Sequence, residues 1–245
     1  MSSHLLQTTR LTQQFGAFLA LDGVDLALPP REVRAVIGPN GAGKTTLVNA
    51  LSGSIRPTSG RIYFNDRKIT RWPMARRARA GLVRTFQTSA LFPGLSVRAH
   101  VEMALGHGRL RLNRHGALQD QIMEVAERAG FADRQDALVK TMSHGERRRL
   151  ALEMALAMAP TILMLDEPMA GLTRDEAQSL IDRLRQLEEV TLLIIEHDMD
   201  VVFRLADRIT VLHRGAVLAE GTPSAIQDDA DVQAVYLGRD GRAGA

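Results

Sequence analysis

Short apolar segments that end in polar or glycine-rich turns recur along the chain, and this pattern predicts β-strands. Val33–Ile37 and Thr161–Leu165 are apolar at nearly every position, which is typical of buried strands in a parallel sheet. Thr191–Ile195 is a third segment of this kind. Turn residues on both sides of Arg61–Phe64 predict a further strand. We therefore expect a parallel sheet with a β-rich element beside it.

Longer segments with apolar residues at helical spacing lie between these strands and give an α/β pattern. The stretch 96–141 is helical in pattern and poor in β-branched residues, so we interpret it as an inserted helical lobe. Near the end, residues 208–213 and 216–220 predict a hairpin, and residues 224–237 are expected to form a helix. The clearest helices are Thr45–Leu51, Gln119–Ala129, Glu146–Ala159 and Arg174–Leu187.

The composition supports a globular protein with a sizeable core. The chain has 245 residues, of which 45% are apolar, and its net charge of +3 does not require a nucleic-acid partner. Zero cysteines exclude a disulfide scaffold and thiolate metal sites. The start lacks the apolar core of a signal peptide, and the apolar stretches are shorter than the roughly 20 residues that cross a bilayer. We expect a cytosolic protein that reaches a membrane only through a partner.

Residues 38–45 read GPNGAGKT and match the pattern G-x-x-x-x-G-K-[ST] between a predicted buried strand and a predicted helix. Glycines let the backbone wrap a phosphate chain, and the amides and the helix N-terminus present positive potential to it. Lys44 is expected to reach the β- and γ-phosphates, and Thr45 to bind Mg²⁺. The residues expected to contact the nucleotide here are Gly38, Pro39, Asn40, Gly41, Ala42, Gly43, Lys44, Thr45 and Thr46.

Two adjacent carboxylates, Asp166 and Glu167, follow the predicted buried strand that ends at Leu165. Ligands of open α/β sheets gather at the carboxyl ends of the strands. An acidic pair in such a turn is often only solvated, but next to a phosphate loop it has a function. We expect Asp166 to hold Mg²⁺ and Glu167 to polarise the water that attacks the γ-phosphate.

His197 follows the predicted strand Thr191–Ile195. A metal site is the alternative, but the seven histidines are scattered without a recognisable ligand spacing. A histidine in this place can also be a hydrogen-bonded structural residue. Beside a nucleotide site, it is expected to contact the γ-phosphate and hold the attacking water in line.

A serine, a histidine, a glycine and a glutamate stand together at residues 143–146. Ser143, His144 and Glu146 are too close in sequence to form a hydrolytic triad, and a metal ion would need ligands that the chain does not offer.

The arginines that follow at 147–149, and those at positions 76, 77 and 79, are expected to be solvated on helix faces.

Taken in this order, the phosphate loop, residues 143–146, the acidic pair and His197 resemble the ATP-binding cassette of ABC transporters, and the resemblance covers nearly the whole chain. It implies a P-loop NTPase core with a parallel sheet, an antiparallel β subdomain and an inserted helical subdomain. The cassette domain would span residues 1–238, with the helical subdomain at approximately 88–159 and a flexible tail at 239–245.

The resemblance also implies roles for single residues. ATP would be sandwiched between two copies of the domain, with Ser143 and Gly145 capping the γ-phosphate held by the second copy. Phe15 resembles the aromatic residue that stacks on adenine, and Gln87 the glutamine that links Mg²⁺ and the attacking water to the helical lobe. Thr173 departs from the aspartate usual at its position, although threonine is a good helix N-cap.

Within this family, the segments 83–87, 196–199 and 235–238 are most similar to ATPases of importers for branched-chain amino acids and related small polar solutes such as amides or urea. Such a system implies permease subunits, a second cassette, an extracytoplasmic solute-binding protein and a peripheral location at the cytoplasmic face of the membrane. The apolar residues Leu91, Phe92 and Leu95 are a candidate surface for a permease helix.

Other functions remain as alternatives. An ABC-type export or extraction ATPase has a similar size and a similar Tyr-Leu-Gly end. A soluble ABC-type ATPase that acts on DNA or ribosomes usually has two cassettes or a long coiled coil, for which 245 residues leave no room. A kinase or GTPase with the same phosphate loop would leave the residues at 143–146 unexplained.

Overall fold

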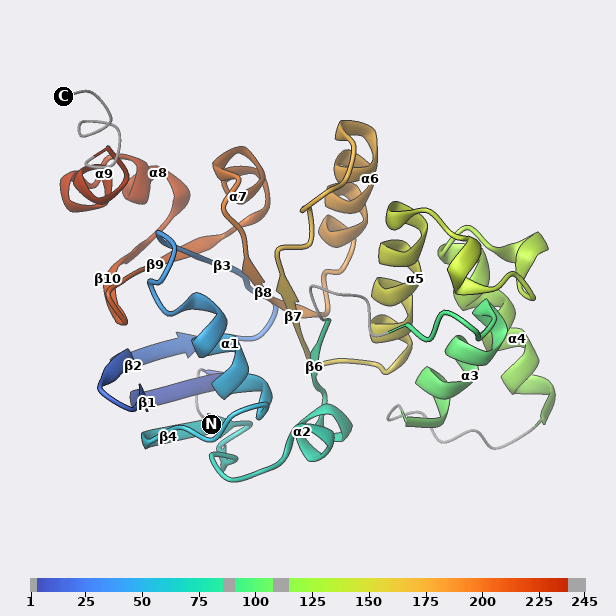
Figure 1. Cartoon of the computed structure of the whole chain (residues 1–245), viewed down its shortest axis with the longest axis horizontal. Coiled ribbons are helices and arrows are strands. Elements are labelled where there is room, and N and C mark those ends of the chain that lie inside the picture. The colour runs from blue at the N-terminus through green and yellow to red at the C-terminus, as the bar shows by residue number, and fades with distance from the viewer. Residues whose placement is uncertain (1–3, 86–90, 108–114, 238–245) are drawn as a thin grey trace. The chain divides into compact units, whose positions relative to one another are not determined.

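The computed structural model describes residues 4–85, 91–107 and 115–237 of the chain. These residues form two compact units (Figure 1). Unit 1 comprises residues 1–74 and 188–245, and unit 2 comprises residues 75–187. The predicted tail at 239–245 and Gln87 lie outside the described residues.

Unit 1 contains an antiparallel sheet with the strand order β2-β1-β4-β5. The long hairpin of β1 and β2 was not predicted, because β1 is rich in threonine and glutamine and its pairing is interrupted by register shifts after Thr8. Its buried residues nevertheless alternate along the strand, so that one face packs inward. The sheet is the β-rich element expected from the sequence. Its strands are β1 Leu6–Phe15, β2 Phe18–Leu28, β4 Ser59–Phe64 and β5 Arg67–Lys68.

Unit 1 also contains a parallel set of strands. The central strand β3, Val33–Ile37, pairs in parallel with β8, Thr191–Ile195, and with β9, Arg208–His213. β10, Ala216–Gly221, pairs antiparallel with β9 and completes the predicted hairpin. All five residues of β8 are buried, as the uninterrupted apolar pattern predicted. The helix that follows the phosphate loop is α1, Lys44–Ser52.

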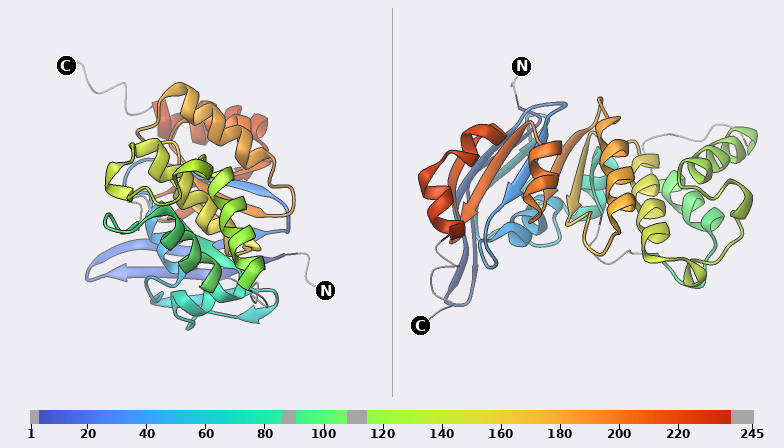
Figure 2. Two further views of the ribbon diagram at one scale, coloured as in Figure 1. Left: turned by 90° about the vertical axis from the view of Figure 1, so that its right-hand side faces the viewer. Right: turned by 90° about the horizontal axis from the view of Figure 1, so that it is seen from above.

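Three short helices cover one face of these strands in unit 1 (Figure 2). They are α7, Met199–Leu205, α8, Pro223–Gln227, and α9, Ala230–Leu237. The prediction of a single helix at 224–237 is therefore wrong. Asp228 ends α8, and the side chain of Asp229 accepts hydrogen bonds at 2.9 Å from the next backbone amides, which starts a new helix.

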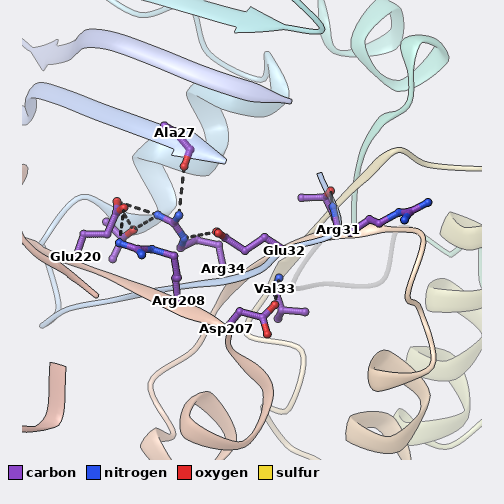
Figure 3. Close-up of polar contacts among 10 residues, drawn as sticks. Ala27, Arg31, Glu32, Val33, Arg34, Asp207, Arg208 and Glu220 are labelled. Carbon is purple, nitrogen blue, oxygen red and sulfur yellow. Dashed lines mark hydrogen bonds and ion pairs between the residues drawn. The ribbon is translucent and has the colours of Figure 1, made fainter. Parts of the chain in front are cut away.

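A buried arginine joins the two sheets of unit 1 (Figure 3). The Arg34 guanidinium lies 2.6 Å from Glu32 Oε1 and 2.8 Å from Glu220 Oε2, and it donates to the Thr210 hydroxyl at 3.0 Å. It also donates to the carbonyl of Ala27 in β2 at 3.2 Å. A charge with 1% of its surface exposed is tolerated because its donors meet these acceptors.

Unit 2 pairs two parallel strands with a set of helices. The strands are β6, Leu82–Arg84, and β7, Ile162–Asp166. The helices are α2 Met74–Ala80, α3 Val97–His107, α4 His115–Arg128, α5 His144–Ala157 and α6 Arg174–Arg185. In the helical lobe expected at 96–141, buried residues such as Val101 and Ile122 form one core cluster with Leu150 of the later helix α5.

A buried carboxylate connects three helices of unit 2, namely α4, α5 and α6. Glu153 of α5 accepts two hydrogen bonds from Arg183 of α6, at 2.7 and 3.1 Å, and lies 3.3 Å from the Arg128 guanidinium of α4. The hydrogen bonds to Glu153 raise the pKa of Arg183 above the ordinary value.

Among the described residues, no helix combines the length and the apolar character that a membrane crossing needs.

Candidate functional site

The phosphate loop of unit 1 has the conformation that its glycines were expected to permit. It leaves β3 at Ile37 and enters α1 at Lys44. Gly38, Gly41 and Gly43 have φ angles of 148°, 81° and 102°, which disfavour any side chain. Gly43 is the N-cap of α1 and provides no side-chain cap, and a helix N-terminus of this kind is favourable to an anion.

Neighbouring backbone holds the loop closely from two sides. A Cβ at Gly38 would collide with the carbonyl oxygen of Leu212 in β9, and one at Gly43 would lie 2.5 Å from the carbonyl oxygen of Ala20 in β2. The turn between β9 and β10 donates from the Gly215 amide to the Ala42 carbonyl at 3.0 Å. The loop is therefore built by contact with backbone, and only glycine fits where the approach is closest.

Lys44 lies along the loop. Its Nζ donates to the carbonyl oxygens of Gly38 at 2.6 Å and Pro39 at 3.1 Å. Thr45, next along α1, is exposed, and Thr46 is half-buried. A cation and a hydroxyl at the start of the same helix suit a phosphate chain with a bound divalent ion.

His197 lies next to the phosphate loop within unit 1. β8 pairs with β3 in a register that sets Ile195 against Val36, so the residues that follow each strand leave the sheet side by side. The imidazole is 67% exposed and its Nδ1 lies 3.8 Å from Oε2 of the buried Glu196. The side chain is therefore accessible to a ligand on the loop.

Phe15 stands at the end of the β1–β2 hairpin, opposite Phe18. The two rings are 50% and 61% exposed, which is unusual for phenylalanine. Cross-strand partners lie on the same face of a sheet, so the rings form a small aromatic surface. The same strand, β2, touches Gly43 two residues further on, at Ala20, so that the hairpin end lies close to the phosphate loop.

The acidic pair of unit 2 is at the end of β7, as predicted. Asp166 is the last strand residue and is buried, and its Oδ2 accepts a hydrogen bond from Arg84 of β6 at 2.7 Å. Glu167 is half-buried with a φ of 47°, in the left-handed region that a residue with a side chain seldom occupies. The strand thus ends in a sharp turn immediately after its two carboxylates.

Ser143 is the N-cap of α5, and it forms a capping box with Glu146. Its hydroxyl accepts from the Glu146 amide at 3.1 Å, and the Glu146 carboxylate accepts from the Ser143 amide at 2.8 Å. The hydrogen bond from the Ser143 backbone amide, and after it the one from the Arg134 side chain, lower the pKa of Glu146 below its ordinary value. The cap keeps the exposed start of α5 ordered.

The start of α6 packs on Gly145. A Cβ there would meet the end of the Glu176 side chain, which would have to shift. Glu176 in turn forms a capping box with Thr173, so the interpretation of Thr173 as an N-cap is confirmed. The hydrogen bonds from Thr173 lower the pKa of Glu176. His144 is exposed beside Gly171, in the turn that leads to Thr173.

The expected site residues fall into two groups, one in each unit. The phosphate loop, Phe15 and His197 lie in unit 1, whereas unit 2 contains Asp166 and Glu167 as well as the start of α5. No single unit therefore contains all the residues of the expected site.

Two arginines contradict the expectation of solvated helix faces. Arg77 is buried, and burial lowers its pKa to about 10. Arg148 is half-buried and donates to the backbone carbonyls of Glu167, at 2.8 Å, and of Ala170. A run of identical residues carries no signal for which member turns inward, so sequence reasoning missed both.

Comparison with known proteins agrees with this geometry. A family model described as "ABC transporter" matches residues 21–170, and one described as "Branched-chain amino acid ATP-binding cassette transporter" matches residues 216–242. The high-affinity branched-chain amino acid transport ATP-binding protein BraF of Pseudomonas aeruginosa is 39% identical, with 97% of this chain and 99% of that protein covered.

Solved structures give the same answer for the fold. The ADP conformation of an ATP-binding cassette of an ABC transporter has a TM-score of 0.85 and 28% identity, and covers 97% of this chain and 100% of that chain. The dimeric structure of a bacterial ABC transporter cassette has a TM-score of 0.80 and 25% identity, over 89% and 98% of the two chains.

The strand, phosphate loop and helix of unit 1 define a P-loop nucleotide-binding protein. The chain belongs to the ABC transporter family, as one of its ATP-binding cassettes. The predicted fold class and the resemblance drawn from the sequence are thereby confirmed.

Proposed function

We propose that this cassette hydrolyses ATP as a subunit of a membrane importer for branched-chain amino acids or related small polar solutes. The proposal is based on two features found together in this chain. One is the phosphate loop that leads into α1, and the other is the exposed helix start that Ser143 caps. The names of the relative BraF and of the family model at residues 216–242 support the class of solute.

In this proposal, the amides of residues 38–46 and Lys44 hold the phosphate chain, and Phe15 stacks on the adenine. The helix N-terminus of α1 at Gly43 and the exposed Phe15 ring support these roles. Lys44 exchanges its two loop carbonyl acceptors for phosphate oxygens, which are charged and therefore stronger acceptors.

For hydrolysis, we assign the general base to Glu167, with His197 and Gln87 placing the attacking water. His197 is exposed beside the loop, whereas Gln87 lies outside the described residues. The Glu167 carboxylate takes the proton from water, and the imidazole donates a hydrogen bond to the γ-phosphate.

Thr45, Asp166 and Gln87 are the residues we assign to Mg²⁺. Hydroxyl, carboxylate and carboxamide oxygens are the hard donors that this ion prefers. Within the described part of the chain, the ion pair of Asp166 with Arg84 occupies only Oδ2, which leaves Oδ1 for a cation. When bound, the ion would neutralise charge on the phosphate oxygens.

A second cassette, identical or paralogous, would complete each nucleotide site. We assign Ser143 and Gly145 to the γ-phosphate held by the partner, because Ser143 is exposed at the N-cap of α5 and a helix start is favourable to an anion. The dimeric cassette structure with 25% identity supports a pair of this kind. We assign residues 1–238 to one cassette domain with a helical subdomain at approximately 88–159.

An apolar groove in unit 2 is the surface that we propose for the permease. It has a volume of about 530 Å³ and opens beside the exposed ring of Phe92, which is 58% accessible. Such a groove suits a helix with one apolar face. The residues that line the groove include Val83, Leu91, Phe92, Met103, Met154 and Met158.

We propose that the complex lies peripherally at the cytoplasmic face of the membrane, with an extracytoplasmic solute-binding protein.

The hydrolytic role is tested with Glu167→Gln. We expect the ATPase rate to fall by roughly 100-fold or more, because a general base contributes about that much, while ATP remains bound. The trapped pair of cassettes should appear as a doubled mass in light scattering. Glu127→Gln, which changes an exposed carboxylate on α4, is the matched control and should behave as wild type. A normal rate in Glu167→Gln would refute the assignment.

The transport role is tested by affinity purification from membranes. We expect permease subunits to co-purify with the wild-type chain and to be lost with Phe92→Asp, which places a charge at the groove. Binding of radiolabelled leucine, and separately of urea, to the solute-binding protein of the same system then distinguishes the two classes of solute. Co-purification of nucleic acid or ribosomes instead would favour the soluble alternative.

A further inference from the structure

Arg148 joins two parts of unit 2 that have different tasks in the proposed function. It lies on α5, five residues after the N-cap Ser143. Its guanidinium donates through one nitrogen to the carbonyl of Glu167, at 2.8 Å, and through the other to the carbonyl of Ala170. The helix that begins at Ser143 is thus attached to the turn that begins at Glu167.

The attached turn is one that needs support. Glu167 has a φ of 47°, which is unfavourable for a residue with a side chain. Its carbonyl also accepts from the Ala170 amide at 3.2 Å, and the Leu172 amide donates to Met169 at 3.2 Å. Arg148 therefore supplies a side-chain hydrogen bond to the same carbonyl that closes the turn, and so acts on the backbone of Glu167 directly.

The Arg148 guanidinium can hold the turn after Glu167, whereas a lysine ammonium or the neighbouring Arg149 cannot do so in the same way. Its planar fork reaches two carbonyls together, whereas a lysine ammonium is a single point of charge. Arg149, the next residue, is exposed and acts electrostatically on Glu176.

We propose that Arg148 is a positioning residue that links the two nucleotide sites of the cassette pair. The inference rests on the proposed function, in which α5 caps the partner's nucleotide while Glu167 of the same chain serves its own. When α5 seats on the partner's γ-phosphate, Arg148 transmits its position to the backbone of Glu167 and sets the carboxylate for the attacking water. Hydrolysis at one site then depends on nucleotide at the other.

The test compares Arg148→Met and Arg148→Lys with Arg149→Met in the assembled transporter. We measure kcat, KM for ATP, the Hill coefficient and binding of a fluorescent ATP analogue. A misplaced reacting group costs on the order of 100-fold, so Arg148→Met should lower kcat by roughly 10- to 100-fold while nucleotide binding is unchanged. The Hill coefficient should fall from about 2 in the wild type toward 1.

Arg148→Lys should keep the charge and the fold but lose one of the two hydrogen bonds, and so show a smaller loss of kcat with the same reduced cooperativity. Arg149→Met should match the wild type in all four measurements. Normal kcat and cooperativity in both Arg148 variants would overturn the inference, as would a wild-type Hill coefficient of about 1. If the Arg148 variants lost nucleotide binding in parallel with kcat, Arg148 would have only a structural role, and the inference would be overturned as well. A wild-type transporter without ATPase activity would instead refute the proposed function.

Discussion

The phosphate loop of unit 1 and the start of α5 in unit 2 are both suited to an anion, but they are held in different ways. The loop is fixed by backbone: Gly38 and Gly43 press against the carbonyls of neighbouring strands. The start of α5 is fixed by side chains, through the capping box of Ser143 with Glu146 and through the hydrogen bonds of Arg148.

This difference has a functional consequence. Backbone packed against a buried sheet has few alternative positions, which suits a loop that must hold the nucleotide through each cycle. Polar side chains at a helix start can exchange partners at small cost, which suits the surface that, in the proposed function, meets and leaves a second cassette. The loop should therefore be sensitive to added atoms, and the start of α5 to removed polar groups.

The largest expected effect on nucleotide affinity is that of Gly43→Ala. The new Cβ would lie 2.5 Å from the Ala20 carbonyl oxygen, at a φ of 102°. Backbone strain alone is worth about 1–3 kcal/mol, and the collision must also move the loop, so we expect nucleotide affinity to fall by roughly 100-fold or more. Titration with a fluorescent ATP analogue measures it.

Gly41→Ala is the matched control for this change. Gly41 has a φ of 81°, but nothing lies within 4 Å of the added Cβ. It therefore carries the strain without the collision, and its loss of affinity should be clearly smaller. Equal losses in the two variants would show that close backbone contact does not hold the loop.

The largest expected effect on the free energy of unfolding is that of Arg34→Met. The change leaves the largely buried Glu32 carboxylate without its cation, and breaking a buried ion pair costs about 3–5 kcal/mol of unfolding free energy. Arg34 is at the far end of β3 from the phosphate loop, so the nucleotide affinity of the folded protein should change little. Urea unfolding measures the stability.

Arg31→Met serves as the control for Arg34→Met. Its ion pair with Glu189 is as short, at 2.6 Å, but the Arg31 side chain is 65% exposed. An exposed pair contributes about 0–1 kcal/mol. If the two variants lose the same stability, burial is not what gives Arg34 its importance in unit 1.

The smallest effect concerns the side-chain cap of unit 2. The pKa of Glu146 is lowered in the folded protein, chiefly by the Ser143 amide. Its stabilisation is therefore complete above the unfolded pKa of about 4.3 and is lost as the pH falls through the folded value. Glu146→Gln should remove this acid-dependent loss of stability.

Loss of a helix cap costs about 1 kcal/mol, which sets the size of the effect. Urea unfolding of the wild type and of Glu146→Gln, from neutral pH down to about pH 3, is the measurement. The two stability curves should differ in slope only in the acid range. Parallel curves would contradict the role of the capping box.

Several elements could be predicted from local pattern alone. β3 and β8 have the predicted bounds, and β7 is shifted by one residue, because uninterrupted apolar runs in a buried sheet leave little choice of boundary. The phosphate loop follows directly from its glycine spacing. The predictions failed where polar residues build a strand, as in β1, and where an aspartate interrupts a helix, as at Asp229.

By itself, the sequence determined the chemistry of this protein: the phosphate loop, the carboxylates at the end of β7 and the serine that caps α5 are local patterns with local causes. Only the tertiary structure decided which charges turn inward. Arg34 is buried because strands distant in sequence bring Glu220 and Ala27 to it, and Arg148 because the turn after Glu167 folds beneath α5. Burial of a charge depends on partners delivered by other elements, and no local pattern contains that information.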